Sequence, residues 1–337
     1  YNINFFTYED RTKSKKLKNK FKFNKKINLI ESKFIFYVNS RYLKYIFCSL
    51  RLFFFCLFNQ GIIVSFQGNL LPIIVAKFTG KKIIIRCNTA PSKYITNTFK
   101  RKLFRFFYSL SDMILVTSED FRKEIRRFFK LRSYVHRQSL DIDYIKKKSK
   151  VKFKFDFFEK FKGIKIINIG RLTSQKDQLT LLKAFNKLIK FKNSRLLLIG
   201  SGKDKNDLKR YIEQNKLNHY VKFIPFTKNP FKYIVRSDVK VLSSRFEGNP
   251  NILLEVACLN RLIISSDCNV GPREILQSEK GGLLFKVGNS EKLFYLLKNL
   301  KLNSKKIKNK IKVSYEYVAT NYQKDISISF IKLIKDI

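Results

Sequence analysis

The chain has 337 residues, of which 71 are Lys or Arg and 25 are Asp or Glu, giving a formal net charge of +46. A domain usually contains ~100–200 residues, so this length predicts two domains. Only two His residues occur, which argues against a His-based metal site and a Ser-His-Asp triad. The five Cys residues are odd in number and form no CxxC pair, as is typical of a reduced, cytoplasmic protein.

The basic excess has more than one explanation. A nucleic acid, an anionic membrane surface or a phosphorylated substrate would each favour it. Phe, Ile and Asn are also abundant, and their codons are A/T-rich like those of Lys, so a biased genome explains the charge equally well. No nucleic-acid recognition motif accompanies the charge. We therefore expect no nucleic-acid partner and keep a basic nucleic-acid-binding protein as a remote alternative.

Short apolar runs alternate with helical segments along the first 148 residues. The most apolar window, residues 45–58, contains Arg51 and is shorter than the ~20 apolar residues of a membrane span, so it predicts a helix packed on a sheet. The basic segment 11–26 predicts an exposed loop, and no secretory leader is recognisable. Strands are predicted at 2–8, 26–29, 61–66, 82–86 and 113–117, and helices at 70–78, 97–109 and 119–130.

After residue 150 the alternation becomes regular and predicts a parallel sheet covered on both faces. Ligands bind at the carboxyl ends of such strands, so functional residues are expected directly after them. A basic helix with a solvated face is predicted at 301–312 and another helix at 325–337. Strands are predicted at 164–169, 196–199, 221–224, 239–242 and 262–265, and helices at 177–191, 205–214, from near Pro250, from near Gly271, and at 291–300.

Two cations follow the first of these strands. Gly170 allows a sharp turn, and Arg171 and Lys176 lie five residues apart before a predicted helix. A planar guanidinium and a compact ammonium together suit a phosphate group. In a chain so rich in Lys, a solvated basic loop is the competing interpretation.

A second group of residues surrounds the helix predicted near Pro250. Asn249 is a suitable N-cap and Pro250 fits the first helical position, so free N–H groups are expected at the strand end. Glu247 precedes this helix and Glu255 lies within it. Eight residues of helix span about 12 Å, so the two carboxylates can accept hydrogen bonds from hydroxyls at the two ends of a sugar nucleotide. Such a spacing also arises by chance.

In this order, the segments GRL-x-x-QKD, FEGNPNILLE and SDC-x-x-GPREIL resemble glycosyltransferase family 4, whose fold is GT-B. The resemblance covers residues 164–300 and extends weakly back to Gly61. It implies retaining, metal-independent transfer of a hexosyl-type sugar from a nucleotide-diphosphate sugar, with no cofactor. It also implies that Arg171 and Lys176 hold the diphosphate, Glu247 the sugar and Glu255 the ribose. The surrounding donor-binding positions are Gly170, Gly248, Asn249, Pro250 and Asn251.

The resemblance further implies two Rossmann-like domains that face a cleft. Residues 1–148 would form the acceptor domain, residues 149–320 the donor domain, and residues 321–337 a helix that packs back on the acceptor domain. The family's first strand and glycine-rich loop have no counterpart, and about thirty residues, the size of a βαβ unit, would account for them. Arg86 and Asn88 are the candidates on the acceptor side.

Some positions depart from the family pattern. Asn260-Arg261-Leu262 replaces a usual Gly-x-Pro, and Cys87-Asn88 stands where many members have His. An inactive or truncated homologue is therefore the alternative to an active enzyme. The acceptor is expected to be a glycan or lipid-linked sugar in surface polysaccharide or lipopolysaccharide biosynthesis. The basic aromatic segment 99–108 favours peripheral contact at the inner face of the plasma membrane, although codon bias and ordinary packing also explain it.

Overall fold

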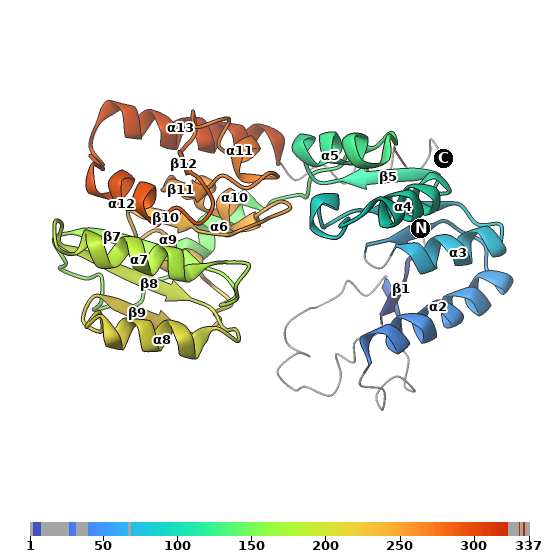
Figure 1. Cartoon of the computed structure of the whole chain (residues 1–337), viewed down its shortest axis with the longest axis horizontal. Coiled ribbons are helices and arrows are strands. Elements are labelled where there is room, and N and C mark those ends of the chain that lie inside the picture. The colour runs from blue at the N-terminus through green and yellow to red at the C-terminus, as the bar shows by residue number, and fades with distance from the viewer. Residues whose placement is uncertain are drawn as a thin grey trace. The chain divides into compact units, whose positions relative to one another are not determined.

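A computed structural model describes residues 3–7, 27–31, 40–66, 69–322, 330 and 333 of the chain (Figure 1). These residues form two compact units. The N-terminal unit takes the described residues up to Val116 together with 125–134, and the C-terminal unit takes 117–124 and the described residues from Val135 onward. Each unit is an α/β structure built on parallel strands, which confirms the predicted fold class. The domain limits at 148 and 320 stay predictions.

The N-terminal unit contains two sheets. The first is a parallel pair, and the second has the order β3-β4-β5-β6 with β3, β4 and β5 parallel. The predicted strands and helices are confirmed within a few residues, whereas the basic segment 11–26 lies outside the described residues. The elements are β1 (Ile3–Thr7), β2 (Ile27–Glu31), α2 (Arg41–Phe58), β3 (Ile63–Ser65), α3 (Leu70–Phe78), β4 (Ile83–Arg86), α4 (Thr98–Ser109), β5 (Met113–Val116), α5 (Glu119–Phe129) and β6 (Tyr134–Val135).

Helix α2 contains the most apolar window of the chain. It lies against α3, but its outward face also carries large apolar side chains. Within the described residues, no helix has the length and apolarity needed to span a membrane. The exposed apolar residues are Leu43, Ile46, Phe47, Leu50, Phe54, Leu57 and Phe58.

The C-terminal unit is built on a six-stranded, fully parallel sheet with the order β12-β11-β10-β7-β8-β9. Strand β7 lies at its centre, with β8 on one side and β10 on the other. The sequence predicted five of these strands and missed β12, which has only three residues. The strands are β7 (Ile164–Ile169), β8 (Ser194–Ile199), β9 (Val221–Ile224), β10 (Val239–Leu242), β11 (Leu262–Ser266) and β12 (Leu283–Phe285).

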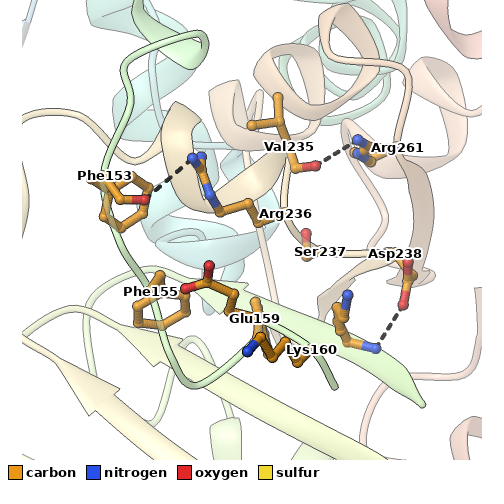
Figure 2. A pocket seen from close by; sticks show the side chains of 11 residues that line it. Phe153, Phe155, Glu159, Lys160, Val235, Arg236, Ser237, Asp238 and Arg261 are labelled. Carbon is orange, nitrogen blue, oxygen red and sulfur yellow. Dashed lines mark hydrogen bonds between the residues drawn. The ribbon is translucent and has the colours of Figure 1, made fainter. Parts of the chain in front are cut away.

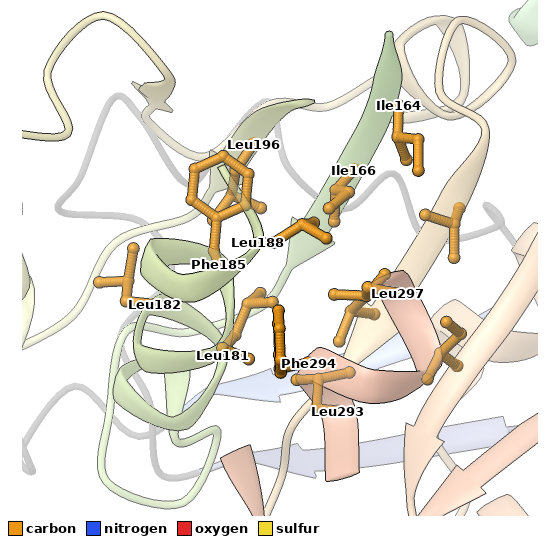
Figure 3. Packing of buried hydrophobic residues seen from close by; sticks show 14 of the residues in the cluster. Ile164, Ile166, Leu181, Leu182, Phe185, Leu188, Leu196, Leu293, Phe294 and Leu297 are labelled. Atoms are coloured by element: carbon orange, nitrogen blue, oxygen red, sulfur yellow. The ribbon is translucent and has the colours of Figure 1, made fainter. Parts of the chain in front are cut away.

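Alternate residues of each strand enter two separate hydrophobic cores because side chains of a strand point to opposite faces. Ile164 and Ile166 enter the core that contains α7 and α12, shown in Figure 3. Ile167 enters the core on the other face, which contains α10. Both faces of the sheet are thus covered. The helices are α6 (Ile142–Ser149), α7 (Gln178–Leu188), α8 (Lys205–Gln214), α9 (Phe231–Ile234), α10 (Asn251–Cys258), α11 (Pro272–Ile275) and α12 (Ser290–Lys298).

A long helix, α13 (Lys305–Asn321), follows α12. Its first turns are the predicted basic helix, with Lys305 and Lys308 exposed. The helix continues beyond residue 312 because Ser314 and Val318 are buried farther along it. The helix predicted at 325–337 falls mostly outside the described residues, of which only Phe330 and Leu333 belong to that stretch and are helical.

Candidate active site

The loop after β7 is held by the loop after β8. The backbone N–H of Gly170 donates to Ile199 O at 3.0 Å, and that of Leu172 donates to Ser201 O at 3.0 Å. Gly200 has a φ of +152°, and a Cβ added there would lie 1.9 Å from the carbonyl oxygen of Gly170. The glycine therefore permits the close approach that fixes the turn at Gly170. The turn at Gly200 thus supports the loop after β7.

Arg171 and Lys176 both lie on this loop, in different surroundings. The Arg171 side chain is exposed, and its Nη2 donates to Gln175 Oε1 at 3.1 Å. Lys176 is largely covered, and its Nζ lies 2.5 Å from Glu247 Oε1. Gln175 links the loop after β7 to the loop after β10. Its side-chain Nε2 donates to Phe246 O, and its backbone carbonyl accepts from the Arg245 N–H. The structure therefore brings the two predicted cations beside the predicted carboxylate.

Glu247 is fixed from two sides. Its Oε1 accepts hydrogen bonds from Lys176 Nζ and, at 2.6 Å, from Ser244 Oγ. Only 9 % of the residue is exposed. Among the described residues, its Oε2 has no hydrogen-bond partner. A buried carboxylate oriented through one oxygen keeps the other oxygen available to accept a hydroxyl proton.

The start of α10 differs from the prediction. The helix begins at Asn251, Pro250 occupies the N-cap position with φ −74° and ψ 93°, and no side chain caps the helix. The prediction of Asn249 as N-cap is therefore wrong, because the chain turns into the helix two residues after it. Gly271, with φ +95°, packs against this turn, and a Cβ there would lie 2.7 Å from Gly248 O.

The third motif, SDC-x-x-GPREIL, follows β11 and lies at the same carboxyl edge of the sheet. Ser266 Oγ and Cys268 Sγ both donate to Ser244 O, at 2.6 and 3.1 Å. Glu274 accepts from Arg137 Nη2 and from Tyr317 Oη, each at 3.2 Å. The motif thus holds Ser244, which in turn orients Glu247.

Glu255 lies on α10, where burial is the main influence on its carboxyl group. Burial raises the pKa of Glu255 to about 7, and the nearby Lys240 opposes that rise. At neutral pH the carboxyl group is therefore near its titration midpoint. The distance from Glu247 expected for a sugar nucleotide stays a prediction.

Lys240 is a charged residue of this region that the sequence analysis missed. It is fully buried in β10, and its Nζ donates to Ile169 O at 3.3 Å. Lys176, Glu247 and Glu255 all act on it electrostatically. The sequence did contain an indication of a buried charge, since one Lys interrupts the otherwise apolar strand VKVL. It was hidden by the abundance of Lys elsewhere.

The two acceptor-side candidates lie in the N-terminal unit. Arg86 ends β4, burial lowers its pKa, and its guanidinium carbon lies 5.9 Å from the centre of the Phe66 ring. Asn88 is exposed, and its Nδ2 donates to Phe66 O at 2.7 Å. Both residues thus contact Phe66 after β3, and their role toward an acceptor stays a prediction.

A pocket of about 410 Å³ lies at the opposite edge of the C-terminal sheet (Figure 2). Lys165, Asp238 and Arg261 line it where β7, β10 and β11 begin, next to Phe153 and Arg236. Ligands of parallel α/β sheets bind at the carboxyl ends of the strands. Strand direction therefore favours the carboxyl edge as the functional site despite the volume of this pocket. Within the described ranges, no three His, Cys, Asp or Glu side chains are grouped so as to hold a metal ion.

Comparison with known proteins relates the C-terminal unit to glycosyltransferases. Residues 149–316 match the family model described as glycosyl transferases group 1. A glycosyltransferase of Methanocaldococcus jannaschii is 35 % identical over 181 residues, which are 52 % of this chain and 45 % of that protein. Residues 149–316 are therefore similar to the group 1 glycosyl transferases.

A second relative matches a longer part of this chain, 255 residues. The N-acetylgalactosamine-N,N'-diacetylbacillosaminyl-diphospho-undecaprenol 4-alpha-N-acetylgalactosaminyltransferase of Campylobacter jejuni is 26 % identical, with 72 % of this chain and 68 % of that protein covered. The chain thus spans less than half of the length of the M. jannaschii protein and about two thirds of the length of the C. jejuni protein.

Solved structures support the fold of the whole chain. Anabaena HepE in complex with UDP and glucose superposes with a TM-score of 0.74 at 11 % identity, covering 92 % of this chain and 86 % of that one. Sucrose-phosphate synthase from Thermosynechococcus elongatus gives 0.73 at 14 %, with 92 % and 82 % covered. The chain has the GT-B fold, with two Rossmann-like α/β units.

Proposed function

We propose that this protein is a retaining glycosyltransferase that moves a hexosyl-type sugar from a nucleotide-diphosphate sugar to a glycan or lipid-linked acceptor. The family of residues 149–316 supports the transferase class. The contact between Lys176 and Glu247 carries the assignment of the site, because it joins the loops after β7 and β10 at the carboxyl edge of the sheet.

The cations of the β7 loop would bind the donor diphosphate. As the sugar–oxygen bond breaks, negative charge accumulates on the departing nucleoside diphosphate, and fixed positive charge stabilises that state. Arg171 is exposed and has N–H groups beyond the one given to Gln175. Lys176 uses one of its three N–H groups on Glu247, so the others can bind phosphate while the ion pair persists. The reaction would then need neither a metal ion nor an organic cofactor.

Glu247 would hold the transferred sugar. Lys176 and Ser244 fix its Oε1, which leaves Oε2 to accept from sugar hydroxyls. The backbone N–H groups of Asn249 and Asn251 would face the sugar and the phosphate at the start of α10, where the helix dipole favours a negative charge. Gly170 and Gly248 would line the same region. Glu255, farther along α10, would accept from the ribose hydroxyls in its ionised form.

The acceptor is proposed from two relatives and from surface chemistry. One relative is named for a diphospho-undecaprenol-linked substrate and another, from Erwinia amylovora, for amylovoran biosynthesis. We propose a similar role in surface polysaccharide or lipopolysaccharide assembly in the cytoplasm, at the inner face of the plasma membrane. Arg86 and Asn88 would lie on the acceptor side.

Helix α4 supports contact with an anionic membrane. Lys100, Lys102 and Arg105 are exposed beside Phe99, which is 73 % exposed, and Phe106, which is 60 % exposed. The protein should bind vesicles that contain anionic lipid and dissociate in 1 M salt, where the screening length is ~3 Å. Absence of binding at low salt would show that this charge serves no membrane contact.

Thermal protection by nucleotides tests the proposed function. Uridine or guanosine diphosphate should raise the melting temperature in the presence of a chelator, with about 2.7 kcal/mol of stabilisation at a hundredfold excess over Kd. The corresponding nucleoside without phosphates is the control and should protect much less. No shift with any nucleoside diphosphate at millimolar concentration would contradict the proposal.

A further inference from the structure

Glu274 joins three separate segments of the C-terminal unit through one carboxylate. It lies in α11, and only 11 % of its side chain is exposed. Its Oε1 accepts from Arg137 Nη2 and from Tyr317 Oη, each at 3.2 Å, and its Oε2 accepts from the backbone N–H of Asp120 at 2.9 Å. Both oxygens of this carboxylate therefore bind groups of the protein itself, unlike those of Glu247.

Two of the three segments lie where the chain passes between its units. Residues 117–124 belong to the C-terminal unit and residues 125–134 to the N-terminal unit, so the boundary falls within α5. Asp120 precedes the N-terminal stretch and Arg137 follows it. Glu274 therefore binds the chain both before it leaves the C-terminal unit and after it returns.

The contact with Asp120 is made in the first turn of α5. The backbone N–H groups of a first helical turn have no acceptor within the helix. Ser118 Oγ accepts from the Phe121 N–H at 3.2 Å, and Glu274 Oε2 accepts from the Asp120 N–H. A carboxylate at this end of a helix is also stabilised by the helix dipole. Glu274 thus caps α5 from a helix more than 140 positions farther along the chain.

The candidate donor-binding turn before α10 contacts both elements that the Arg137–Glu274 ion pair joins. Gly271, directly before α11, packs so closely on this turn that a Cβ there would lie 2.7 Å from a backbone oxygen of the turn. Gln138, the neighbour of Arg137, donates from Nε2 to Asn251 Oδ1. Printed side-chain and backbone contacts therefore run from the turn to both segments at which the chain changes units.

We propose that Glu274 is a positioning residue that transmits ordering of the donor-binding turn to the two segments at which the chain passes between its units. This inference rests on the proposed function. Glu274 acts through α11 and Arg137 rather than through contact with the donor. Binding that orders one part of a bonded network also restricts the parts attached to it. A bound nucleotide should therefore reduce local opening at Asp120 and around Arg137 as well as at the turn.

Amide hydrogen exchange tests this inference, because the Asp120 N–H is itself one of the bonded groups. Exchange is followed with and without excess uridine or guanosine diphosphate, which in wild type should slow segments 117–124, 135–140 and 243–255. Glu274→Ala removes all three bonds, so exchange at Asp120 without nucleotide should become about tenfold faster or more. In this variant the nucleotide should still slow segment 243–255 but no longer segment 117–124.

Two further variants separate transmission from a loss of stability. Arg137→Met breaks one of the bonds to Glu274 and should abolish the nucleotide-dependent slowing of segment 135–140, even if Glu274→Ala folds poorly. Tyr317→Phe is the matched control, because it removes a bond of similar length to the same carboxylate from α13, where the chain does not change units. It should leave the nucleotide-dependent slowing of segment 117–124 intact.

Slowing of segment 117–124 that persists in Glu274→Ala would overturn the inference, as would an equal loss of slowing in Tyr317→Phe. If the nucleotide protects segment 243–255 of wild type but neither 117–124 nor 135–140, the inference fails while the proposed function stands. If wild type binds no nucleoside diphosphate, the proposed function fails first and this inference with it.

Discussion

The two edges of the C-terminal sheet both carry cations and carboxylates, but the partners differ. At the amino edge the charged groups bind the backbone: Arg236 donates to Phe153 O, Arg261 donates to Val235 O, and Asp238 accepts from the Lys165 N–H. At the carboxyl edge the two predicted cations bind other side chains, Arg171 with Gln175 and Lys176 with Glu247.

The difference distinguishes cations that hold the fold from cations that are candidates for ligand binding, in a chain with 71 Lys and Arg residues. At the amino edge, Arg236 and Arg261 are bound to the backbone carbonyls of Phe153 and Val235, and Asp238 is bound to the N–H of Lys165 in β7. At the carboxyl edge Arg171 stays exposed and Glu247 Oε2 stays available among the described residues. Spare hydrogen-bonding capacity at a strand's carboxyl end, rather than charge alone, marks the candidate site.

Removal of either loop cation should give the largest effect. Arg171→Ala or Lys176→Ala should lower turnover about a hundredfold or more, because in the proposed function each would stabilise charge on the leaving group. Arg171→Lys should recover part of the loss, since an ammonium cannot replace the planar guanidinium. Turnover is measured as sugar transfer, or as donor hydrolysis if no acceptor is known.

Cations elsewhere provide the controls for that experiment. Arg236→Ala at the amino edge, and Lys301→Ala or Lys305→Ala before and at the start of α13, should change turnover little. Similar small losses at all of these positions would show that Arg171 and Lys176 contribute only bulk charge, and the distinction between the edges would fail.

Glu255 should give a smaller effect that depends on pH. In the proposed function its carboxylate would accept hydrogen bonds from both ribose hydroxyls when it is ionised, and burial raises its pKa to about 7. Wild-type affinity for the nucleoside diphosphate should therefore fall as the pH drops from 8 to 6. Glu255→Gln should bind about tenfold more weakly at pH 8 and lose this dependence, as measured by titration calorimetry.

The same pKa predicts the effect on stability. Because the folded-state pKa lies above the ordinary value of 4.5, the folded protein binds this proton more tightly than the unfolded chain. The resulting stabilisation is full below about pH 4.5 and is lost as the pH rises through about 7. Glu255→Gln should then melt above wild type at pH 8 and converge with it in acid. A lower melting temperature at pH 8 would contradict this account of the buried carboxyl group.

The amino edge should affect stability without affecting chemistry. Asp238→Ala removes the acceptor of the Lys165 N–H and should cost about 1–3 kcal/mol of unfolding free energy in denaturant titration. Turnover at a temperature where the variant is folded should stay near wild type. A specific loss of turnover would give the amino-edge pocket a functional role.

The sequence predicted the order of strands and helices in the C-terminal unit because each buried strand is a short apolar run between turns. It also placed Arg171, Lys176 and Glu247 at one edge, since parallel strands end together. The ion pair between Lys176 and Glu247 joins residues 71 positions apart, and local sequence patterns do not predict a contact at that separation. Lys240 was missed because a single Lys within an apolar run does not stand out in a chain with 71 Lys and Arg residues.

Other errors have local causes. Asn249 and Pro250 suit the start of a helix, yet the turn at Gly248, packed against Gly271, delays α10 until Asn251. Strand β12 is three residues long, too short for any periodicity to show. The sequence predicted that this basic helix ends at residue 312, because Lys residues are frequent only up to that point. In the structure α13 continues to Asn321, and Val318 is buried in this second half.

Amide hydrogen exchange with and without a nucleoside diphosphate tests the central claim most directly, because it reports both edges of the sheet in one experiment. Uridine and guanosine diphosphate are each added in excess, with a chelator present. We expect slower exchange in segments 168–178 and 243–255, which contain the carboxyl-edge loops, and unchanged exchange in segments 153–160 and 234–238 at the amino edge. Protection confined to the amino edge, or none at either edge, would contradict the assignment of the donor site.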